Sequence, residues 1–273
     1  MRGLTNYHLS CCVNTLLQTF SATWELLDLL VRSDSLSIPL ELKKVLTAMR
    51  ADLTQPAPHQ DFLHCLDRYC IRLDTQHDAD EVFLSILNLM QQQIDDRHLA
   101  LEIKDLYKIS VETHLQCLQC NSTKTLESYQ LSLPLHIKED HNTLEDCMIS
   151  FFEHQELRGV NCCSCAHCGT KTPFKQGVKL RSLPRILCIH LKRFRNTRGL
   201  LQKLHSRVTF PEICVFLTQN DCKFSLYAVV VHYGTAMFGH YTAYVRHRRS
   251  GSWYHADDSC VQPVRHSGRS LSD

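Results

Sequence analysis

The hydrophobic pattern changes its period partway along the chain, and this change limits the possible folds more than any other feature. From Val13 to Val31 apolar residues recur at helical spacing, at Val13, Leu16, Leu17, Phe20, Trp24, Leu27 and Val31. A second helical stripe, formed by Phe83, Ile86, Leu87 and Met90, follows the polar segment DTQHDAD, which suits a helix start. Roughly the first 100 residues are therefore predicted to be mainly helical.

After about Leu106 the segments alternate or run in β-branched and aromatic residues, which is typical of strands. These segments are YKISVETHLQC, LESYQLSLPLHI, RILCIHLKRF, SLYAVVVHYG, HYTAYVRH and SWYHADD. One helix, TLEDCMISFFE, interrupts them, with Thr143 and Asp146 as a capping pair. The order predicts an α+β fold in which helices come first and a mixed or antiparallel sheet follows.

The charge is close to balanced, with 30 Lys and Arg against 28 Asp and Glu, so no overall field attracts nucleic acid or a membrane surface. The segment MRGLTNYHLSCC lacks a secretory signal, and apolar runs such as ELLDLLV are too short to span a bilayer. We expect an intracellular protein without membrane insertion. In a reducing compartment its 15 cysteines are metal-bound, catalytic or buried rather than disulfide-linked.

Two Cys-x-x-Cys pairs, Cys117/Cys120 and Cys165/Cys168, predict a structural zinc site. Each pair can hold one edge of a tetrahedral ion, and two pairs close the shell against water. The second cluster, NCCSCAHC, leaves alternatives, since Cys162 can also pair with Cys165 and His167 is a possible ligand. We favour Cys165 and Cys168 because Gly169 suits the turn that follows. Free thiols in loops are the simpler alternative.

Cys11 stands just before the first helical stripe, where unpaired N–H groups and the helix dipole favour a thiolate. Taken alone, Cys11 and Cys12 are more often two small buried residues. His240 follows a glycine turn at the start of a strong strand, which suits a base presented into a cleft. The next strand ends in Asp257 and Asp258, which can fix the imidazole tautomer. The candidate residues thus come in the order Cys, His, Asp along the chain.

Several segments together resemble the ubiquitin-specific protease family along almost the whole chain. GLTNYHLSCCVNTLLQ is similar to its cysteine box, QHDADEVFL to its second box, and LYAVVVHYGTAMFGHYTAYV with WYHADDS to its histidine box. The segments YQLSLPL, LPRILCIHLKRF and VTFP match strands of its palm. The resemblance implies a papain-like catalytic domain over 1–273, with a helical thumb (1–104), zinc-tipped fingers (105–135 and 155–180) and a palm sheet (136–154 and 181–273).

The resemblance also implies roles for individual residues. Cys11 would be the nucleophile, His240 the general base and acid, Asp257 its orienting partner with Asp258 as support, and Asn6 the donor to the oxyanion. The implied substrate-binding residues are Gln76, Asp78, Gly239 and Tyr241. For Gln76 and Asp78 a helix-capping pair is the alternative.

Within the family, the doubled cysteine, His77 and the run LNLMQQQIDDRHLALEIKDLYKISV are similar to a member that removes the interferon-induced, two-lobed ubiquitin-like modifier from lysines. This likeness implies that modifier and its conjugates as partners, and a non-enzymatic role at the type I interferon receptor. A ubiquitin deubiquitinase and a catalytically weak scaffold are the alternatives. We expect a monomer in the cytoplasm, with the nucleus as a second compartment. Lys192 and Arg193 with RHRR are expected to be solvated rather than a nucleic-acid site.

Two departures from the family pattern affect the site. His8, Leu9 and Ser10 replace Gly-Asn-Thr, so the loop before Cys11 lacks a glycine. Ala256 replaces an aromatic residue beside Asp257, which thins the packing there. The chain also ends at RHSGRSLSD without the usual closing strands, which predicts a frayed C-terminus.

Overall fold

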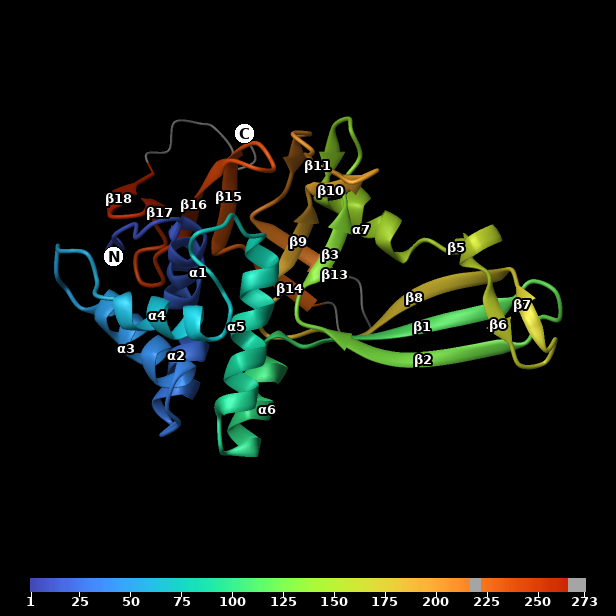
Figure 1. The fold of residues 1–273 in the computed structure, drawn as a ribbon, viewed down its shortest axis with the longest axis horizontal. Coiled ribbons are helices and arrows are strands. Elements are labelled where there is room, and N and C mark those ends of the chain that lie inside the picture. Colours follow the sequence, from blue (N-terminus) through green and yellow to red (C-terminus); the bar gives the residue numbers. More distant parts are fainter. Residues whose placement is uncertain (217–221, 265–273) are drawn as a thin grey trace. The chain divides into compact units, whose positions relative to one another are not determined.

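Helices come first and strands follow, as the periodicity predicts (Figure 1). The computed structural model describes residues 1–216 and 222–264. The chain divides into two compact units. Unit 1 comprises Met1–Leu106, Phe194–Lys203 and the described residues from Ser225 onward, and unit 2 comprises Tyr107–Arg193 and the described residues of Leu204–Phe224. The predicted α+β class is confirmed.

Unit 1 starts with helices whose bounds are α1 Cys11–Ala22, α2 Trp24–Val31, α3 Ile38–Arg50, α4 Gln60–Arg68, α5 Ala79–Gln93 and α6 Arg97–Tyr107, the last ending at the border of unit 2. The continuous stripe predicted from Val13 to Val31 was wrong, because Thr23 leaves helical backbone (φ −89°, ψ 88°). The Thr23 hydroxyl donates to the Thr19 carbonyl (2.9 Å) and lies 2.7 Å from the Tyr227 hydroxyl. These contacts hold the break between α1 and α2.

A four-stranded antiparallel sheet completes unit 1, in the order β15 (Ala228–Gly234), β16 (Gly239–Arg246), β17 (Trp253–Asp257) and β18 (Cys260–Pro263). The hairpin of β10 (Phe194–Thr197) and β11 (Leu200–Lys203) joins it, since the Lys203 ammonium donates to the carbonyls of His232 (2.6 Å) and Gly234 (3.1 Å). The expected absence of a closing strand after Asp257 was wrong, because β18 pairs with β17. The predicted fraying of 265–273 lies outside the described residues.

The core of unit 1 lies between its helices and this sheet, and α1 packs against β16. Leu17 and Phe20 of α1 are almost fully buried, and the Phe20 ring stacks on Phe83 of α5 with centroids 5.8 Å apart. Asp78 caps α5 by accepting a hydrogen bond from the Asp80 N–H (2.8 Å). The apolar stripes predicted within α1 and α5 are thus buried in the core, whereas the prediction was wrong for Val31, which is 60% exposed at the end of α2.

Unit 2 contains a four-stranded antiparallel sheet in the order β2-β1-β8-β5, with β1 Ile109–Cys117, β2 Thr123–Gln130, β5 Gln155–Leu157 and β8 Phe174–Ser182. The shorter elements are two parallel pairs, β3 (Leu133–His136) with β9 (Ile189–Lys192) and β4 (Asn142–Thr143) with β12 (Val208–Thr209), and two further pairs, β6 (Cys163–Cys165) with β7 (Thr170–Thr172) and β13 (Ile213–Phe216) with β14 (Cys222–Ser225). Helix α7 (Leu144–Phe152) follows β4, and the short 3-10 helix Gly159–Asn161 follows β5. The predicted cap is confirmed, because the Thr143 hydroxyl accepts from the Asp146 N–H (3.0 Å).

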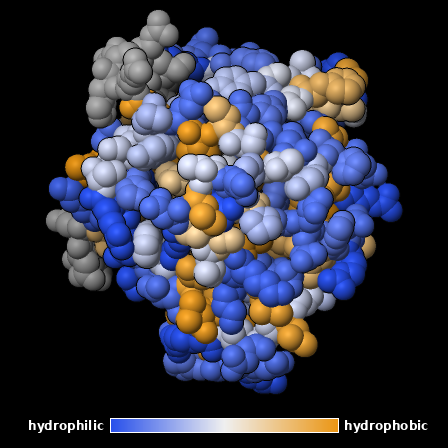
Figure 2. Space-filling view, turned by 90° about the vertical axis from the view of Figure 1, so that its left-hand side faces the viewer, coloured by the Kyte–Doolittle hydropathy of each residue, from blue (hydrophilic) through white to orange (hydrophobic). Residues whose placement is uncertain are grey.

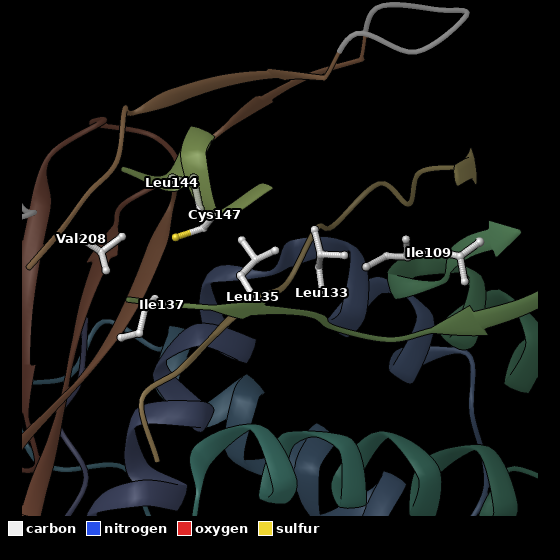
Figure 3. Packing of buried hydrophobic residues seen from close by; sticks show 8 residues of the cluster. Ile109, Leu133, Leu135, Ile137, Leu144, Cys147 and Val208 are labelled. Carbon is white, nitrogen blue, oxygen red and sulfur yellow. The ribbon is translucent and has the colours of Figure 1, made fainter. Parts of the chain in front are cut away.

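A second core lies inside unit 2 (Figure 3). Its buried members come from β1, β3, α7 and β12 and the segment after β3, and they are Ile109, Val111, Leu133, Leu135, Ile137, Leu144, Cys147 and Val208. Leu133 and Leu135 point to the same side because alternate residues of a strand do so, and both are fully buried. The unit therefore has its own hydrophobic support.

No helix within 1–216 and 222–264 has both the length and the apolar character that crossing a bilayer requires. On the face turned to the left in Figure 1, hydrophobic residues form small separate groups among hydrophilic ones (Figure 2).

We expect Leu135→Ala to lower the free energy of unfolding by about 2–5 kcal/mol, because the substitution leaves a cavity in a fully buried place. Urea unfolding followed by circular dichroism measures this change. The control is Leu126→Ala in β2, whose side chain is 41% exposed and should cost under about 0.5 kcal/mol. Equal costs for the two variants would contradict the assignment of this core.

Candidate active site and metal centre

Cys11 is the first residue of α1, as the sequence predicts. The turn before it is held by Ser10, whose hydroxyl accepts from the Tyr7 N–H (2.9 Å) and donates to the Asn6 side-chain oxygen (3.3 Å). Only 3% of Cys11 is exposed, so little room is left for a reactant beside the sulfur. Asn6 is exposed, five residues before it in the sequence.

Burial raises the pKa of the Cys11 thiol, and the negative charge of Asp258 adds to this effect. The backbone N–H groups of Tyr241, Cys12 and Cys11 itself oppose it by stabilising the thiolate. The Tyr241 contact places the sulfur beside strand β16, next to the residue that follows His240 in the chain. The thiol and the predicted base therefore meet at the same strand.

His240 faces two carboxylates with one ring nitrogen. Its Nε2 is 2.7 Å from Asp257 Oδ1 and 4.0 Å from Asp258 Oδ2. The other ring nitrogen, Nδ1, is left for a second partner, although no hydrogen bond joins it to Cys11 in the described part of the chain. The structure thus brings His240, Asp257 and Asp258 together, and Cys11 reaches the same strand through Tyr241. Resting thiol sites are often looser than the reacting complex.

The segment before α5 is fastened to β16 on both sides of His240. The Gln76 amide donates to the Gly239 carbonyl (3.2 Å), and the Tyr241 hydroxyl donates to the His77 carbonyl (2.9 Å). Asp78 caps α5, which agrees with the helix-capping alternative for this residue. Gly239 and Tyr241 thus flank His240 in β16, and Gln76 contacts Gly239, whereas Asp78 lies at the start of α5.

Gly239 has no room for a side chain. A Cβ there would lie 2.1 Å from Nε2 of His232 and 2.4 Å from the carbonyl oxygen of Tyr233. The His232 ring in turn packs against the rings of Tyr241 (4.6 Å) and Phe194 (5.3 Å). A glycine is needed directly before His240 because an aromatic group fills the space behind it.

The two departures from the family pattern have structural consequences. His8 adopts a φ of 58°, a left-handed backbone that favours glycine, although histidine tolerates it better than most residues. Ala256 is buried in β17, facing Ala243 of β16 across the sheet. The loop before Cys11 thus keeps the backbone shape of a glycine loop without its glycine.

The sequence did not flag two polar residues behind Asp258. The Asn14 amide nitrogen lies 2.8 Å from Asp258 Oδ1, and the Asn14 oxygen lies 2.9 Å from His59 Nε2. Asn14 lies one helical turn after Cys11. The predicted helical stripe began at Val13; a helix predicted to begin at Cys11 would have put Asn14 on the same side as Cys11. No pattern in the sequence marks His59, because only the tertiary fold brings it there.

In unit 2 the four predicted metal ligands cluster. Cys117 Sγ lies 4.0 Å from Cys168 Sγ, and Cys120 Sγ lies 3.6 Å from Cys165 Sγ. Zn–S bonds of about 2.3 Å in a tetrahedron separate the sulfurs by about 3.8 Å, so this arrangement fits zinc. Each pair lies on a tight turn, in which the N–H groups of Asn121 and Gly169 donate to the carbonyls of the first cysteines (2.9 Å each).

The surroundings lower the pKa of two of the four sulfurs, whereas contacts with the neighbouring thiols, first of all Cys120, and burial raise the pKa of Cys168 to about 12. The Ser122 hydroxyl and the Cys168 N–H lower the pKa of Cys165 to about 6, and the Thr172 hydroxyl lowers the pKa of Cys117. Metal ligands must be thiolates, so these donors favour binding. Cys162 and His167, the alternatives from the sequence, are not among the clustered ligands of the described residues. Cys163 packs nearby, and its thiol lies 3.7 Å from the Asn161 carbonyl oxygen.

Comparison with known proteins agrees with this geometry. The sequence profile of the family described as ubiquitin carboxyl-terminal hydrolase matches residues 2–272. Ubl carboxyl-terminal hydrolase 18 of Mus musculus is 34% identical over 284 residues, which cover 95% of this chain and 77% of that protein. The Homo sapiens protein of that name is 32% identical, over 95% of this chain and 76% of its own length.

A more distant relative shares less of its length. The probable ubiquitin carboxyl-terminal hydrolase creB of Aspergillus flavus is 34% identical over 171 residues, which cover 59% of this chain and 22% of that protein. The family profile and the relatives named hydrolase 18 extend over nearly the whole chain and so include both the thiol site and the four cysteines. The chain therefore belongs to the ubiquitin carboxyl-terminal hydrolase family, with its papain-like α+β fold and cysteine-protease chemistry.

Proposed function

We propose that this thiol isopeptidase cleaves the bond between the C-terminal glycine of the interferon-induced, two-lobed ubiquitin-like modifier and a target lysine. The observation that carries the choice of modifier is the similarity, over 95% of the chain, to relatives whose name specifies a Ubl hydrolase. Ubiquitin as the substrate is the alternative.

Cys11 is the proposed nucleophile and His240 its base. The imidazole takes the thiol proton, and the thiolate attacks the glycine carbonyl carbon, whose oxygen becomes an oxyanion. The C–N bond then breaks as the imidazolium gives its proton to the lysine amine, which leaves a thioester on Cys11. Water attacks the thioester as His240 accepts its proton, and the C–S bond breaks to restore the thiolate.

The environment of each group supports its role. Asp257, 2.7 Å from Nε2 of His240, would orient the ring and stabilise the imidazolium, with Asp258 contributing at 4.0 Å. Asn6, whose side-chain oxygen is held by Ser10, would turn its amide N–H groups toward the oxyanion. Such a donor contributes about 3 kcal/mol to the transition state when the geometry is right.

The crowded entrance supports a slender substrate tail. Cys11 is nearly buried, and Gln76 and Tyr241 tie the segment before α5 to β16 beside it. A tail ending in two glycines passes where side chains would collide, and the Asp78 carboxylate would attract a basic residue of that tail. We expect Gly239 and Tyr241 to line the passage.

The hairpin turn between β15 and β16 offers an apolar contact for the modifier itself. Met237 is 62% exposed and Phe238 is 78% exposed, directly before Gly239 and His240. The tip is rigid at its base, because the Thr235 N–H donates to the Phe238 carbonyl (2.8 Å). Large exposed apolar side chains next to a reaction centre are typical of a protein-binding edge.

The remaining assignments follow from the same proposal. The helices of 1–104 would form the thumb, 105–135 with 155–180 the fingers, and the other strands the palm. Zinc would hold the turns at Cys117/Cys120 and Cys165/Cys168 as a structural ion. None of the 15 cysteines, all of which lie in the described part of the chain, forms a disulfide, which supports a reducing compartment such as the cytoplasm or nucleus. A role at the interferon receptor and a monomeric state stay predictions.

The first test uses modifiers that carry an electrophile at the C-terminus. We expect a covalent adduct with the two-lobed modifier, a weaker one with ubiquitin, and none with Cys11→Ala, as read by intact-protein mass spectrometry. The control is Cys70→Ala, which removes an exposed thiol of unit 1 and should label fully. Equal labelling by both modifiers would reject the preference alone, whereas labelling of Cys11→Ala would reject the nucleophile.

We expect Phe238→Ser to raise KM for the modifier conjugate about tenfold with kcat nearly unchanged, because the lost contact is with the modifier's surface and not the reacting bond. Steady-state hydrolysis of a fluorogenic modifier derivative measures both constants. Leu36→Ser, at a similarly exposed leucine between α2 and α3, is the control and should change neither. An unchanged KM in Phe238→Ser would remove this edge from the proposed interface.

The zinc assignment predicts one ion per purified chain and loss of that ion in Cys165→Ser. Cys162→Ser, three residues earlier and outside the clustered ligands, should keep it. Metal content by mass spectrometry of the desalted protein distinguishes the two. Equal zinc content in both variants would show that the ligand set is wrong.

A further inference from the structure

A buried chain of hydrogen bonds runs from the proposed catalytic carboxylates into the interior of unit 1. The Asn14 amide nitrogen donates to Asp258 Oδ1 (2.8 Å), and the Asn14 oxygen lies 2.9 Å from His59 Nε2. Asn14 and His59 are each only 2% exposed. The proposed mechanism uses neither residue.

The direction of these bonds is fixed by chemistry. A carboxylate accepts hydrogen bonds, so the Asn14 nitrogen must face Asp258, and the same nitrogen lies 3.3 Å from the Thr5 carbonyl oxygen. The Asn14 oxygen then faces His59, which must present a proton on Nε2. His59 is therefore the donor that keeps the Asn14 amide from flipping.

The protonation of His59 leaves this conclusion unchanged. Burial, the larger effect, lowers the pKa of His59, whereas the Ala57 carbonyl, 3.2 Å from Nδ1, raises it. In the protonated ring both nitrogens carry a proton, and in the neutral ring the proton belongs on Nε2, where the shorter contact lies. In either state Nε2–H faces Asn14.

The backbone around the chain is equally constrained. The Leu4 N–H donates to the Asp258 carbonyl (2.8 Å), and the Ala57 N–H donates to the Gly3 carbonyl (2.9 Å). A Cβ on Gly3 would lie 2.2 Å from the Ser259 carbonyl oxygen, so only glycine fits at this position of the N-terminal segment. Asp258 itself has a left-handed φ of 47°. Both ends of the polar chain are thus held in place by one extended segment.

The consequence concerns the second carboxylate. With Oδ1 bound to Asn14, the other oxygen of Asp258 stays 4.0 Å from His240 Nε2, and Asp257 keeps the direct contact at 2.7 Å. We propose that His59, acting through Asn14, is a positioning residue that fixes Asp258 beside the imidazole. This inference rests on the proposed role of His240 as the base.

Two amide variants separate positioning from packing. The nitrogen of glutamine in His59→Gln reaches the place of Nε2, whereas that of asparagine in His59→Asn reaches only the place of Nδ1. We expect His59→Gln to keep kcat within about twofold, and His59→Asn to lower kcat about tenfold with KM unchanged, which matches the loss of one oriented hydrogen bond. His64→Gln, at an exposed histidine of helix α4, which begins directly after His59, is the control.

Thermal unfolding checks that both His59 variants fold. Comparison with Asp258→Ala then tests the route: if His59 acts through Asp258, adding His59→Asn to Asp258→Ala lowers kcat little further. Equal kcat in the folded His59→Gln and His59→Asn variants, or fully multiplicative losses with Asp258→Ala, would overturn the inference.

A second readout keeps this test independent of the substrate. The alkylation rate of Cys11 by iodoacetamide, resolved by peptide mass spectrometry, should be slower in His59→Asn than in His59→Gln, because a poorly stabilised imidazolium leaves less thiolate. If the wild type hydrolyses no modifier conjugate, the proposed function fails, but the alkylation test still decides the positioning role. Equal alkylation rates in His59→Asn and His59→Gln overturn that role, and a slower rate in His59→Asn supports it.

Discussion

The packing of α1 against β16 is the constraint on which the thiol site depends. It brings the first residue of a helix against the Tyr241 N–H, so Cys11 meets the strand that carries His240. A helix end supplies N–H groups for a thiolate, yet the same packing buries the sulfur and raises its pKa. The site therefore balances two opposing effects, and in the proposed mechanism the imidazole and its carboxylates decide which one prevails.

The two adjacent carboxylates reach one imidazole because the backbone turns between them. Consecutive residues of a strand point to opposite faces, so Asp257 at the end of β17 would normally leave Asp258 facing away. The left-handed φ of Asp258 breaks this alternation where the chain turns into β18. The strained conformation persists because Leu4 and Asn14 bind Asp258 through its carbonyl and its side chain.

Local patterns in the sequence predicted those features whose causes are local. The stripe in α5, the Thr143 cap and the spacing of Cys117 and Cys120 each depend on neighbours a few residues away. The break at Thr23 was missed because its hydroxyl partner is Tyr227, far along the chain. The Asn14–His59 pair likewise joins segments distant in sequence. His232 meets Gly239, and β18 meets β17, within hairpins, whose strand register periodicity does not report.

The cysteines show why residue type alone does not fix chemistry. In unit 1, burial raises the pKa of the Cys11 thiol, so the proposed mechanism needs an imidazole to accept its proton. In unit 2, hydroxyl and N–H donors lower the pKa of Cys165 to about 6, so that thiol is ready to bind a cation without any base. A nucleophile that must release its product benefits when its sulfur carries a proton between reactions. A structural ligand benefits when its sulfur is always charged. The surroundings of each sulfur, rather than the number of cysteines, therefore separate the proposed reactive site from the proposed metal site.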